Sequence, residues 1–511
     1  MQARGERRKP TPEELKHWAE TFEALSRQGQ NDAVQSIRLL TPDELKNSWN
    51  DICGLVGKSL GRRISPQVQT AATYSLKTLV VEGANLERFI EPAARLLSTT
   101  NAPEVQTALL SFAYDLHKKR RQYDITPFAA GATKCITSNN PKVKTSSLYC
   151  LSGLVSNGQG LNEAETAVPA VVDALSSEEP TIVAAAALTF GKLALADVGY
   201  KVLYGATPQL TQLIPSKEPS VNTAVCGSIA DLANAPSGYR IPPSTASAIV
   251  ALASQDETKQ KSSALGAIGA LGAIWHNYHE RERLNSAVTP TIQAIYDPRE
   301  EVCASGCVAY GGIARSRIGI EELTQNAKRV CELLNHSKPW VSSSACGAIA
   351  GLAAGGVALE AVASSAPVIE GFIASSHNPP LISSACVALV EASLAGVPLK
   401  EGLELEVFPH VKSRIPFVRW SGCTLLGEVG TYTSVMPLSA ALESDDPHTV
   451  WRAAEALERM SIRGVDITPS GQALKKQLVR RWPPDTPSGM VEHIIEHVGN
   501  AIEIAGLTTQ R

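Results

Sequence analysis

Two histidines and a glutamate near the end of the chain have the spacing of a zinc-peptidase motif. His493, Glu496 and His497 form the pattern HxxEH, in which two histidines on one helix face bind Zn²⁺ and the glutamate acts as a base. Only 14 residues follow the motif, whereas such peptidases take a third carboxylate ligand from far downstream. We therefore expect a capping helix with histidines on its polar face, and we keep a zinc peptidase as an alternative. We predict no catalytic residue, metal ligand or cofactor.

The ten cysteines could also bind metal or form disulfides, but their positions favour packing. Cys303 and Cys307 lie one helical turn apart, yet no CxxC pattern or nearby histidine completes a zinc site. Five cysteines recur in one slot of a repeating pattern: Cys226, Cys307, Cys346, Cys386 and Cys423. A small buried hydrophobic role explains this recurrence. Many free thiols indicate a reducing compartment, the cytoplasm or the nucleus.

The elements that carry these residues repeat along most of the chain. An anchor residue, aliphatic in all but one case, recurs about every 38 residues, usually two or three residues after a proline. The anchors are Val68, Val105, Val143, Ile182, Val221, Lys259, Val302, Val341, Ile382, Val418 and Val450. A fixed period of this length indicates a helical solenoid. We call the helix expected to begin at each anchor an anchor helix.

Residues 167–194 illustrate one repeat. Pro169 opens a first helical stretch, a polar turn ends at Pro180, and an anchor helix then runs from Ile182 to Ala194. Proline is tolerated in the first turn of a helix, where its missing N–H would have no partner. The sixth repeat lacks the turn proline, and we expect its anchor helix to extend through residues 276–284. Glycines within the anchor helices predict close stacking, because each exposed one costs about 0.8–1 kcal/mol.

This pattern of a short first helix, a helix opening with proline, a proline-containing turn and a long final helix resembles the armadillo repeat, with HEAT repeats as a close neighbour. The resemblance covers roughly residues 65–462. It implies an all-α, right-handed α-solenoid of about 11 armadillo/HEAT-like repeats with helical caps at both ends. The short period favours helix pairs over triplets.

The ends of the chain predict the remaining organisation. We expect a disordered basic tail at 1–10, an N-terminal helical cap at 11–64, the solenoid at 65–462 and a C-terminal helical cap at 463–511. Thr11-Pro12 and Thr41-Pro42 are each followed by a glutamate that completes a capping box, and so begin two helices of the first cap.

The groove of the solenoid is the first candidate binding site. Many peptide-binding armadillo proteins carry Asn near the end of each anchor helix and some carry Trp one turn earlier. We call the matching positions the ladder positions: Thr78, Asp115, Gly153, Lys192, Asp231, Ala270, Gly312, Gly351, Glu391, Glu428 and Arg459. None of them is Asn, and none of the positions four residues earlier is Trp. The chain therefore lacks the side chains that capture peptides in that manner. Four ladder positions are acidic and could favour a basic ligand: Asp115, Asp231, Glu391 and Glu428.

The turns that leave the anchor helices form a second candidate site, which we call the basic edge. Equivalent turns of a solenoid fall along one edge. The basic edge comprises Lys118, Lys119, Arg120, Arg121, Tyr239, Arg240, His276, Tyr278, His279, Arg281, Arg283, Arg315 and Arg317. Lys and Arg with aromatic neighbours suit an acidic protein surface and, less well, nucleic acid or phospholipid.

Composition supports a binding protein without catalysis. The hydrophobic content is 44%, the aromatic content only 5% and the formal charge −3, which gives no overall attraction to nucleic acid. The sequence contains neither a nucleophile signature nor an apolar run of 18 residues that could span a membrane. We expect a non-enzymatic scaffold or adaptor in the cytoplasm or nucleus that binds protein partners.

Overall fold

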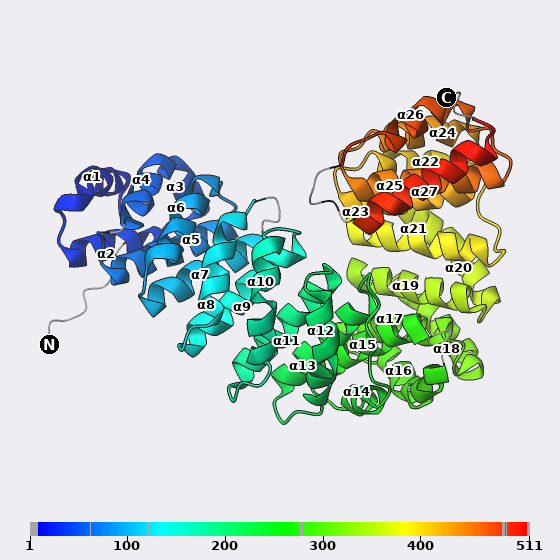
Figure 1. Ribbon diagram of the computed structural model, residues 1–511, viewed down its shortest axis with the longest axis horizontal. Coiled ribbons are helices and arrows are strands. Elements are labelled where there is room, and N and C mark those ends of the chain that lie inside the picture. Colours follow the sequence, from blue (N-terminus) through cyan, green and yellow to red (C-terminus); the bar gives the residue numbers. More distant parts are fainter. Residues whose placement is uncertain are drawn as a thin grey trace. The chain divides into compact units, whose positions relative to one another are not determined.

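The computed structural model describes residues 9–61, 63–119, 123–275, 279–482, 486 and 488–507, and their regular secondary structure is helical, without a β-strand (Figure 1). The chain divides into two compact units, residues 1–245 and 246–511, each of which is described by itself. Among the described residues, no helix combines the length and apolar character needed to cross a bilayer.

The anchor helices pack side by side in sequence order within each unit. In the first unit they are α5 (Pro66–Val81), α7 (Pro103–Lys119), α9 (Pro141–Ser156), α11 (Pro180–Leu195) and α13 (Pro219–Ala233). In the second they are α15 (Thr258–Trp275), α17 (Glu300–Arg315), α19 (Pro339–Gly355), α21 (Pro379–Leu394), α23 (Pro416–Val429) and α25 (Pro447–Ile462). Each therefore buries its sides against its sequence neighbours and leaves one face free.

A second row of helices, the companion helices, packs on the anchor helices and along itself. In the first unit these are α6 (Glu87–Thr99), α8 (Ala129–Ile136), α10 (Leu161–Ala174) and α12 (Tyr200–Gln212). In the second they are α14 (Thr245–Ala253), α16 (Val288–Ile295), α18 (Ile320–Leu333), α20 (Leu359–Ser375), α22 (Leu403–Val411) and α24 (Val435–Leu442). Most repeats are therefore helix pairs, as the short period indicates.

The anchors are the centre of this packing. All ten aliphatic anchors are at most 6% exposed, whereas Lys259 points outward. A proline occupies the first position of most anchor helices, for example Pro180 in α11 and Pro339 in α19. There its fixed φ begins the helix without removing a needed hydrogen bond. The repeat pattern thus describes both the buried face and the helix starts.

A proline recurs in the first part of most repeats, and the sequence predicts that it begins a helix. Pro127, Pro290 and Pro437 lie in the first turn of their helices, but five others do not. Pro169 lies well inside α10, and Pro92, Pro208, Pro367 and Pro409 likewise lie inside companion helices. In α10, Ala164 and Ala167 before the proline are buried. This apolar face continues through the proline, so packing outweighs the single lost hydrogen bond.

The sixth repeat also differs from the prediction. The anchor helix α15 ends at Trp275, and residues His279–Ala287 form a 3-10 helix, η4. A continuous helix through residues 276–284 is therefore wrong for the described part of that segment. The charged run in η4 has few apolar side chains that could be buried along an extended α-helix.

Further helices lie at both ends. The N-terminal set is α1 (Pro12–Thr21), α2 (Arg27–Ser36), α3 (Pro42–Asn47) and α4 (Trp49–Ser59), so there are more than the two helices expected. Both capping boxes are present, Thr11 with Glu14 and Thr41 with Glu44. The C-terminal set is α26 (Gly471–Leu478) and α27 (Ser488–Ile504). Thr468-Pro469 predicts a basic helix through Trp482, but α26 ends four residues earlier, at Leu478.

The recurrent cysteines are packing residues, as predicted. Each of the five is fully buried, and all ten cysteines are free thiols. Burial raises the pKa of the Cys226, Cys346, Cys386 and Cys423 thiols to about 12. Such thiols stay protonated and inert at neutral pH.

Candidate functional site

The acidic ladder residues contact basic side chains of other anchor helices. In the first unit, Lys77 Nζ lies 3.1 Å from Asp115 Oδ2, and Lys192 Nζ lies 2.8 Å from Asp231 Oδ2. Burial raises the pKa of Asp231, against the effect of its hydrogen bond from Lys192. Lys192 and Asp231 are themselves consecutive ladder positions. Both acidic ladder residues of the first unit are therefore paired with internal cations.

The second unit repeats this arrangement. Arg459 of α25 pairs with Glu428 of α23. Arg315 of α17 places a guanidinium nitrogen 2.7 Å from Glu391 Oε1 of α21. That pair spans the end of α19, whose residues in the lining shared with Arg315 and Glu391 are small: Ala353, Ala354 and Gly355. Any basic ligand of these four carboxylates would have to compete with an internal cation.

The glycines of the anchor helices fall into two groups. A Cβ added to Gly312 or Gly351 would lie 2.1 Å from the backbone oxygen of Gly269 or Gly311, respectively, on the neighbouring helix. These glycines permit the close stacking predicted from the sequence. Gly266 and Gly347, in contrast, face open space, with nothing within 4 Å of an added Cβ. Close packing therefore does not explain them.

Open Gly347 lies between two exposed valines. It stands at the middle of α19, and the matching positions are Val308 on α17 and Val387 on α21, which are 44% and 45% exposed. We call these three residues the valine–glycine–valine row. Because neighbouring anchor helices pack in order, the row is an apolar surface with a notch at its centre. The row can be found in the sequence because each of its residues lies four residues, about one helical turn, before a ladder position.

A cavity of about 550 Å³ opens where α17, α19 and α21 end. Arg315, Arg317 and Glu391 supply its charges, and Leu359 and Leu394 its larger apolar side chains. These leucines are 38% and 59% exposed. Alanines and glycines at the end of α19, together with Ala395 at the end of α21, form the rest of the lining. The sequence predicts the arginines as site residues but not the leucines, because no sequence pattern indicates that a single leucine is exposed.

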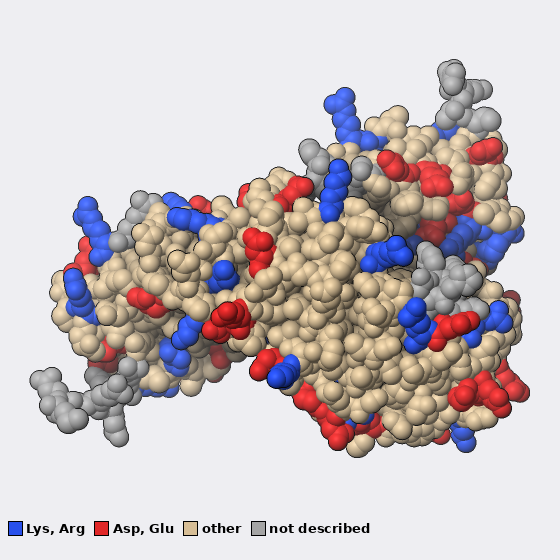
Figure 2. Space-filling view, turned by 60° about the horizontal axis from the view of Figure 1, so that its bottom comes forward, with Lys and Arg blue, Asp and Glu red and all other residues tan. Residues whose placement is uncertain are grey.

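The basic edge is present in part. Lys118, Lys119, Arg240, Arg283 and Arg317 are exposed, whereas Arg315 is held by Glu391. Arg120, Arg121, His276 and Tyr278 lie outside the described residues, as do the side chains of His279 and Arg281. The set draws on both units, so its continuity stays a prediction. On the face drawn in Figure 2, Lys and Arg are interspersed with Asp and Glu.

The sequence predicts Tyr239 to be an exposed residue of the basic edge, but it is buried, with only 6% of its surface exposed. Its ring packs 5.2 Å from that of Tyr200 and 6.3 Å from that of Tyr204, which is 42% exposed. Sequence reasoning missed Tyr204. The signal was its spacing of four from Tyr200, which places both rings on one face of α12.

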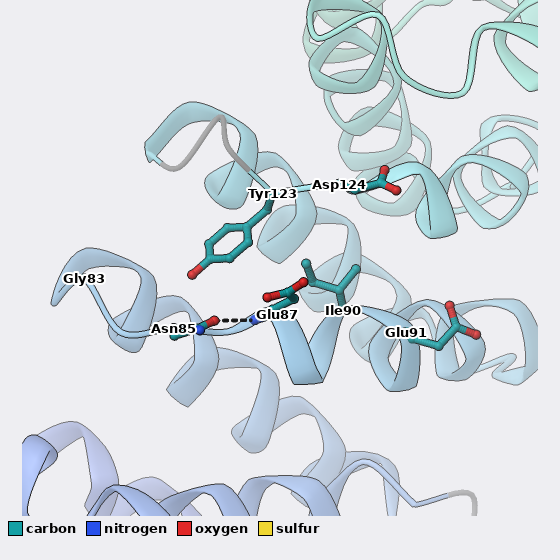
Figure 3. A pocket seen from close by; sticks show the side chains of 7 residues that line it. All are labelled: Gly83, Asn85, Glu87, Ile90, Glu91, Tyr123 and Asp124. Carbon is teal, nitrogen blue, oxygen red and sulfur yellow. Dashed lines mark hydrogen bonds between the residues drawn. The ribbon is translucent and has the colours of Figure 1, made fainter. Parts of the chain in front are cut away.

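The first unit contains an acidic cavity of about 570 Å³ (Figure 3). Two of its three carboxylates have local roles: Asp124 accepts a hydrogen bond from the Thr126 backbone at 2.9 Å, and Glu91 pairs with Arg95 at 3.3 Å. The Tyr123 hydroxyl accepts from the Leu86 backbone at 3.1 Å. In Figure 3 the carboxylates come from separate turns and do not converge. The arrangement stabilises loops and helix starts.

The HxxEH histidines hold α27 on α25. The His493 ring stacks on Trp451 with centroids 5.5 Å apart, and His497 Nδ1 lies 2.5 Å from Glu458 Oε2. Asn500 donates to the other oxygen of Glu458 at 2.8 Å. Across the described ranges, no three His, Cys, Asp or Glu side chains gather as a metal site requires. The two histidines thus have separate packing contacts.

Comparison with known proteins shows the fold. No protein-family model and no curated protein matches the chain. Kap121p bound to Pho4p is similar over 98% of this chain, with a TM-score of 0.54 and 10% identity. Kap121p bound to the extreme C-terminus of the phosphatase Cdc14p is similar over 98%, with a TM-score of 0.52 and 10% identity. The chain spans 59% of the first of these karyopherin chains.

Engineered repeat proteins also match. A designed armadillo repeat protein is 19% identical over 44% of this chain and 99% of its own, with a TM-score of 0.35. At these identities the comparisons describe architecture alone. The two karyopherin structures, with TM-scores above 0.5, agree with the rows of stacked anchor and companion helices. By its fold, the chain is an armadillo/HEAT-type α-solenoid.

Proposed function

We propose that this chain is a non-enzymatic protein-binding scaffold that uses the exposed faces of its anchor helices. Solenoids of stacked helix pairs offer long surfaces to partners. The two karyopherin structures are both described as bound to another protein, Pho4p or the C-terminus of Cdc14p. Ten free cysteines support a reducing compartment, so we propose the cytoplasm or nucleus.

The valine–glycine–valine row carries this proposal. A glycine in the middle of an exposed helix face costs roughly 1 kcal/mol relative to alanine. Gly312 and Gly351 offset that cost by close packing, whereas Gly347 gains no contact from lacking a side chain. Exposed Val308 and Val387 on either side add apolar surface. A notch flanked by apolar side chains fits a partner's side chain or backbone.

The other predicted surfaces are proposed as secondary contacts. The acidic ladder residues could bind a basic segment of a partner only if that segment displaced the internal Lys or Arg side chains that pair with them. Lys118, Lys119, Arg240, Arg283 and Arg317 remain open to an acidic protein surface. Charge reversal at Arg240 and Arg283 is expected to weaken the binding of at least one protein partner. No specific observation favours nucleic acid, for which a continuous basic surface is typical.

Comparative affinity purification tests the function. The variant carrying both Val308→Asp and Val387→Asp places charge on each side of the notch, and Val202→Asp is its control. Val202 is equally exposed, at 45%, but lies on the companion helix α12. We expect the double variant to lose partners that the wild type and Val202→Asp retain. Equal recovery by all three would contradict a role for this face.

A further inference from the structure

We infer that the cavity at the ends of α17, α19 and α21 takes a carboxylate of a protein partner together with an adjacent apolar side chain. This inference rests on the proposed function and adds the chemistry of the partner segment. The cavity offers about 550 Å³, lined by Arg315, Arg317 and Glu391 on its polar side and by exposed Leu359 and Leu394.

Arg317 is the cation available to a ligand. It is exposed, and no ion pair to it occurs among the described residues, whereas Arg315 is held by Glu391 at 2.7 Å. The charges in the lining are therefore two arginines and one glutamate, with one positive charge in excess. A guanidinium with open donors binds a carboxylate through two parallel hydrogen bonds.

The backbone at Arg317 is unusual for its position. It has φ +59°, in the left-handed region, where the chain leaves α17. Five other anchor helices are left through a glycine in this conformation, and α11 is left through Asp197; the glycines are Gly83, Gly158, Gly356, Gly396 and Gly464. A side chain at such a φ is disfavoured, and residues held there concentrate at ligand sites. The choice of arginine over glycine at this turn therefore indicates a role for its side chain.

A simpler role for Arg317 is to offset the partial negative charge at the end of α17. The apolar lining argues for a ligand in addition. Leu359 and Leu394 lie in the same cavity and remain 38% and 59% exposed. No aromatic ring is among the described lining residues, so the cavity lacks a surface on which nucleic-acid bases stack. A partner segment with an acidic residue beside an apolar one matches both the charged and the apolar side of the cavity lining.

The same segment can reach the valine–glycine–valine row. Gly347 and Ala354, which lines the cavity, are seven residues apart on α19, so they are separated by about 10 Å along the helix axis. An extended partner chain covers this distance in about three residues. We therefore expect the carboxylate within about three residues of an apolar side chain that occupies the notch.

Panning a random 12-residue phage-display library against the full chain tests the inference. We expect the wild type to enrich peptides with Asp or Glu next to Leu, Ile, Val or Met. Arg317→Gly should abolish this enrichment without lowering the melting temperature, because glycine suits φ +59°. Arg317→Lys should retain part of it. Lys338→Ser, which removes an exposed cation just before the start of α19, should leave it unchanged.

Fluorescence polarisation gives the decisive comparison. It measures the affinity for one enriched peptide and for its amide counterpart, in which Asp or Glu is replaced by Asn or Gln. We expect at least a tenfold weaker affinity after either the amide change or Arg317→Gly, with no further loss when both are combined. Additive losses, acid-independent binding, or no enrichment on the wild type would overturn the inference. The inference would also be overturned if a 12-residue oligo(U) bound more tightly than the acidic peptide and if its binding depended on Arg317.

The outcome is separable from that of the proposed function. If Val308→Asp with Val387→Asp loses partners while Arg317→Gly keeps them all, the anchor-helix face binds protein and the carboxylate site is wrong. If neither variant loses a partner, both proposals are wrong.

Discussion

Arg315 on α17 reaches across α19 to Glu391 on α21, with 2.7 Å between guanidinium nitrogen and carboxylate oxygen. The end of the intervening helix presents only small residues to the same cavity: Ala353, Ala354 and Gly355. One ion pair thus connects three successive repeats at the rim of the cavity. It also neutralises one of the two arginines, which leaves Arg317 to define the charge of the site.

Glu391→Gln is expected to strengthen binding of an acidic peptide. Removing the carboxylate frees Arg315 and raises the net charge of the cavity by one. The pair is partly exposed, so we expect a loss of at most about 1 kcal/mol in the free energy of unfolding. Isothermal titration with a peptide selected on the wild type, alongside its amide form, measures the effect. Weaker binding of the acidic peptide would contradict the assignment of Arg315 and Arg317.

Alanine at Gly351 and at Gly347 should have opposite effects on stability. A Cβ at Gly351 would lie 2.1 Å from the Gly311 backbone oxygen, and so we expect a loss of about 1–3 kcal/mol. A Cβ at Gly347 meets nothing within 4 Å, so helix propensity should yield a gain of up to about 1 kcal/mol. Urea unfolding followed by circular dichroism compares them. Equal effects would refute the division of the glycines into two groups.

Asp446 should make folding sensitive to acid. Burial alone would raise its pKa, but hydrogen bonds from Thr449, Trp420 and Arg419 outweigh it and hold the pKa below the ordinary 3.8. The stabilisation is therefore complete at neutral pH and is lost as the pH falls through 3.8 and below. The urea midpoint should fall more between pH 6 and pH 3.5 for the wild type than for Asp446→Asn. Identical pH profiles would show that Asp446 contributes nothing.

Cysteine reactivity should follow burial. Cys226, Cys346, Cys386 and Cys423 are fully buried, with pKa values raised to about 12, whereas Cys331 is half-buried. Alkylation of the native protein with iodoacetamide at pH 8, followed by peptide mass spectrometry, should modify Cys331 first. All should react alike in 6 M guanidinium. Rapid native labelling of Cys346 or Cys386 would contradict the packing at these positions.

Much of the fold could be predicted because the repeat amplifies weak local signals. One valine after a proline says little, but its recurrence from Val68 to Val450 identifies the buried face and the helix starts. Pro169 is one of five prolines for which the prediction is wrong: local rules put it at a helix start, whereas packing of Ala164 and Ala167 extends α10 past it. Local propensity carries no information about such tertiary packing.

The candidate site was less accessible to sequence reasoning. Arg315 and Arg317 could be selected by charge and position, but the pairing of Arg315 with Glu391, 76 residues away, depends on the bare surface of α19. Gly347 and Gly351 are identical in sequence terms and one turn apart, yet one faces open space and the other a backbone. Only the packed helices distinguish the two roles.

The most direct test of a protein-binding anchor-helix face is Gly347→Gln compared with Gly371→Gln. Both glycines are exposed in helices with nothing within 4 Å of an added Cβ, but Gly371 lies on the companion helix α20. Both variants should fold with at least wild-type stability. In quantitative affinity purification, Gly347→Gln should lose at least one partner tenfold or more, and Gly371→Gln none. Full recovery of all partners with Gly347→Gln would contradict the account.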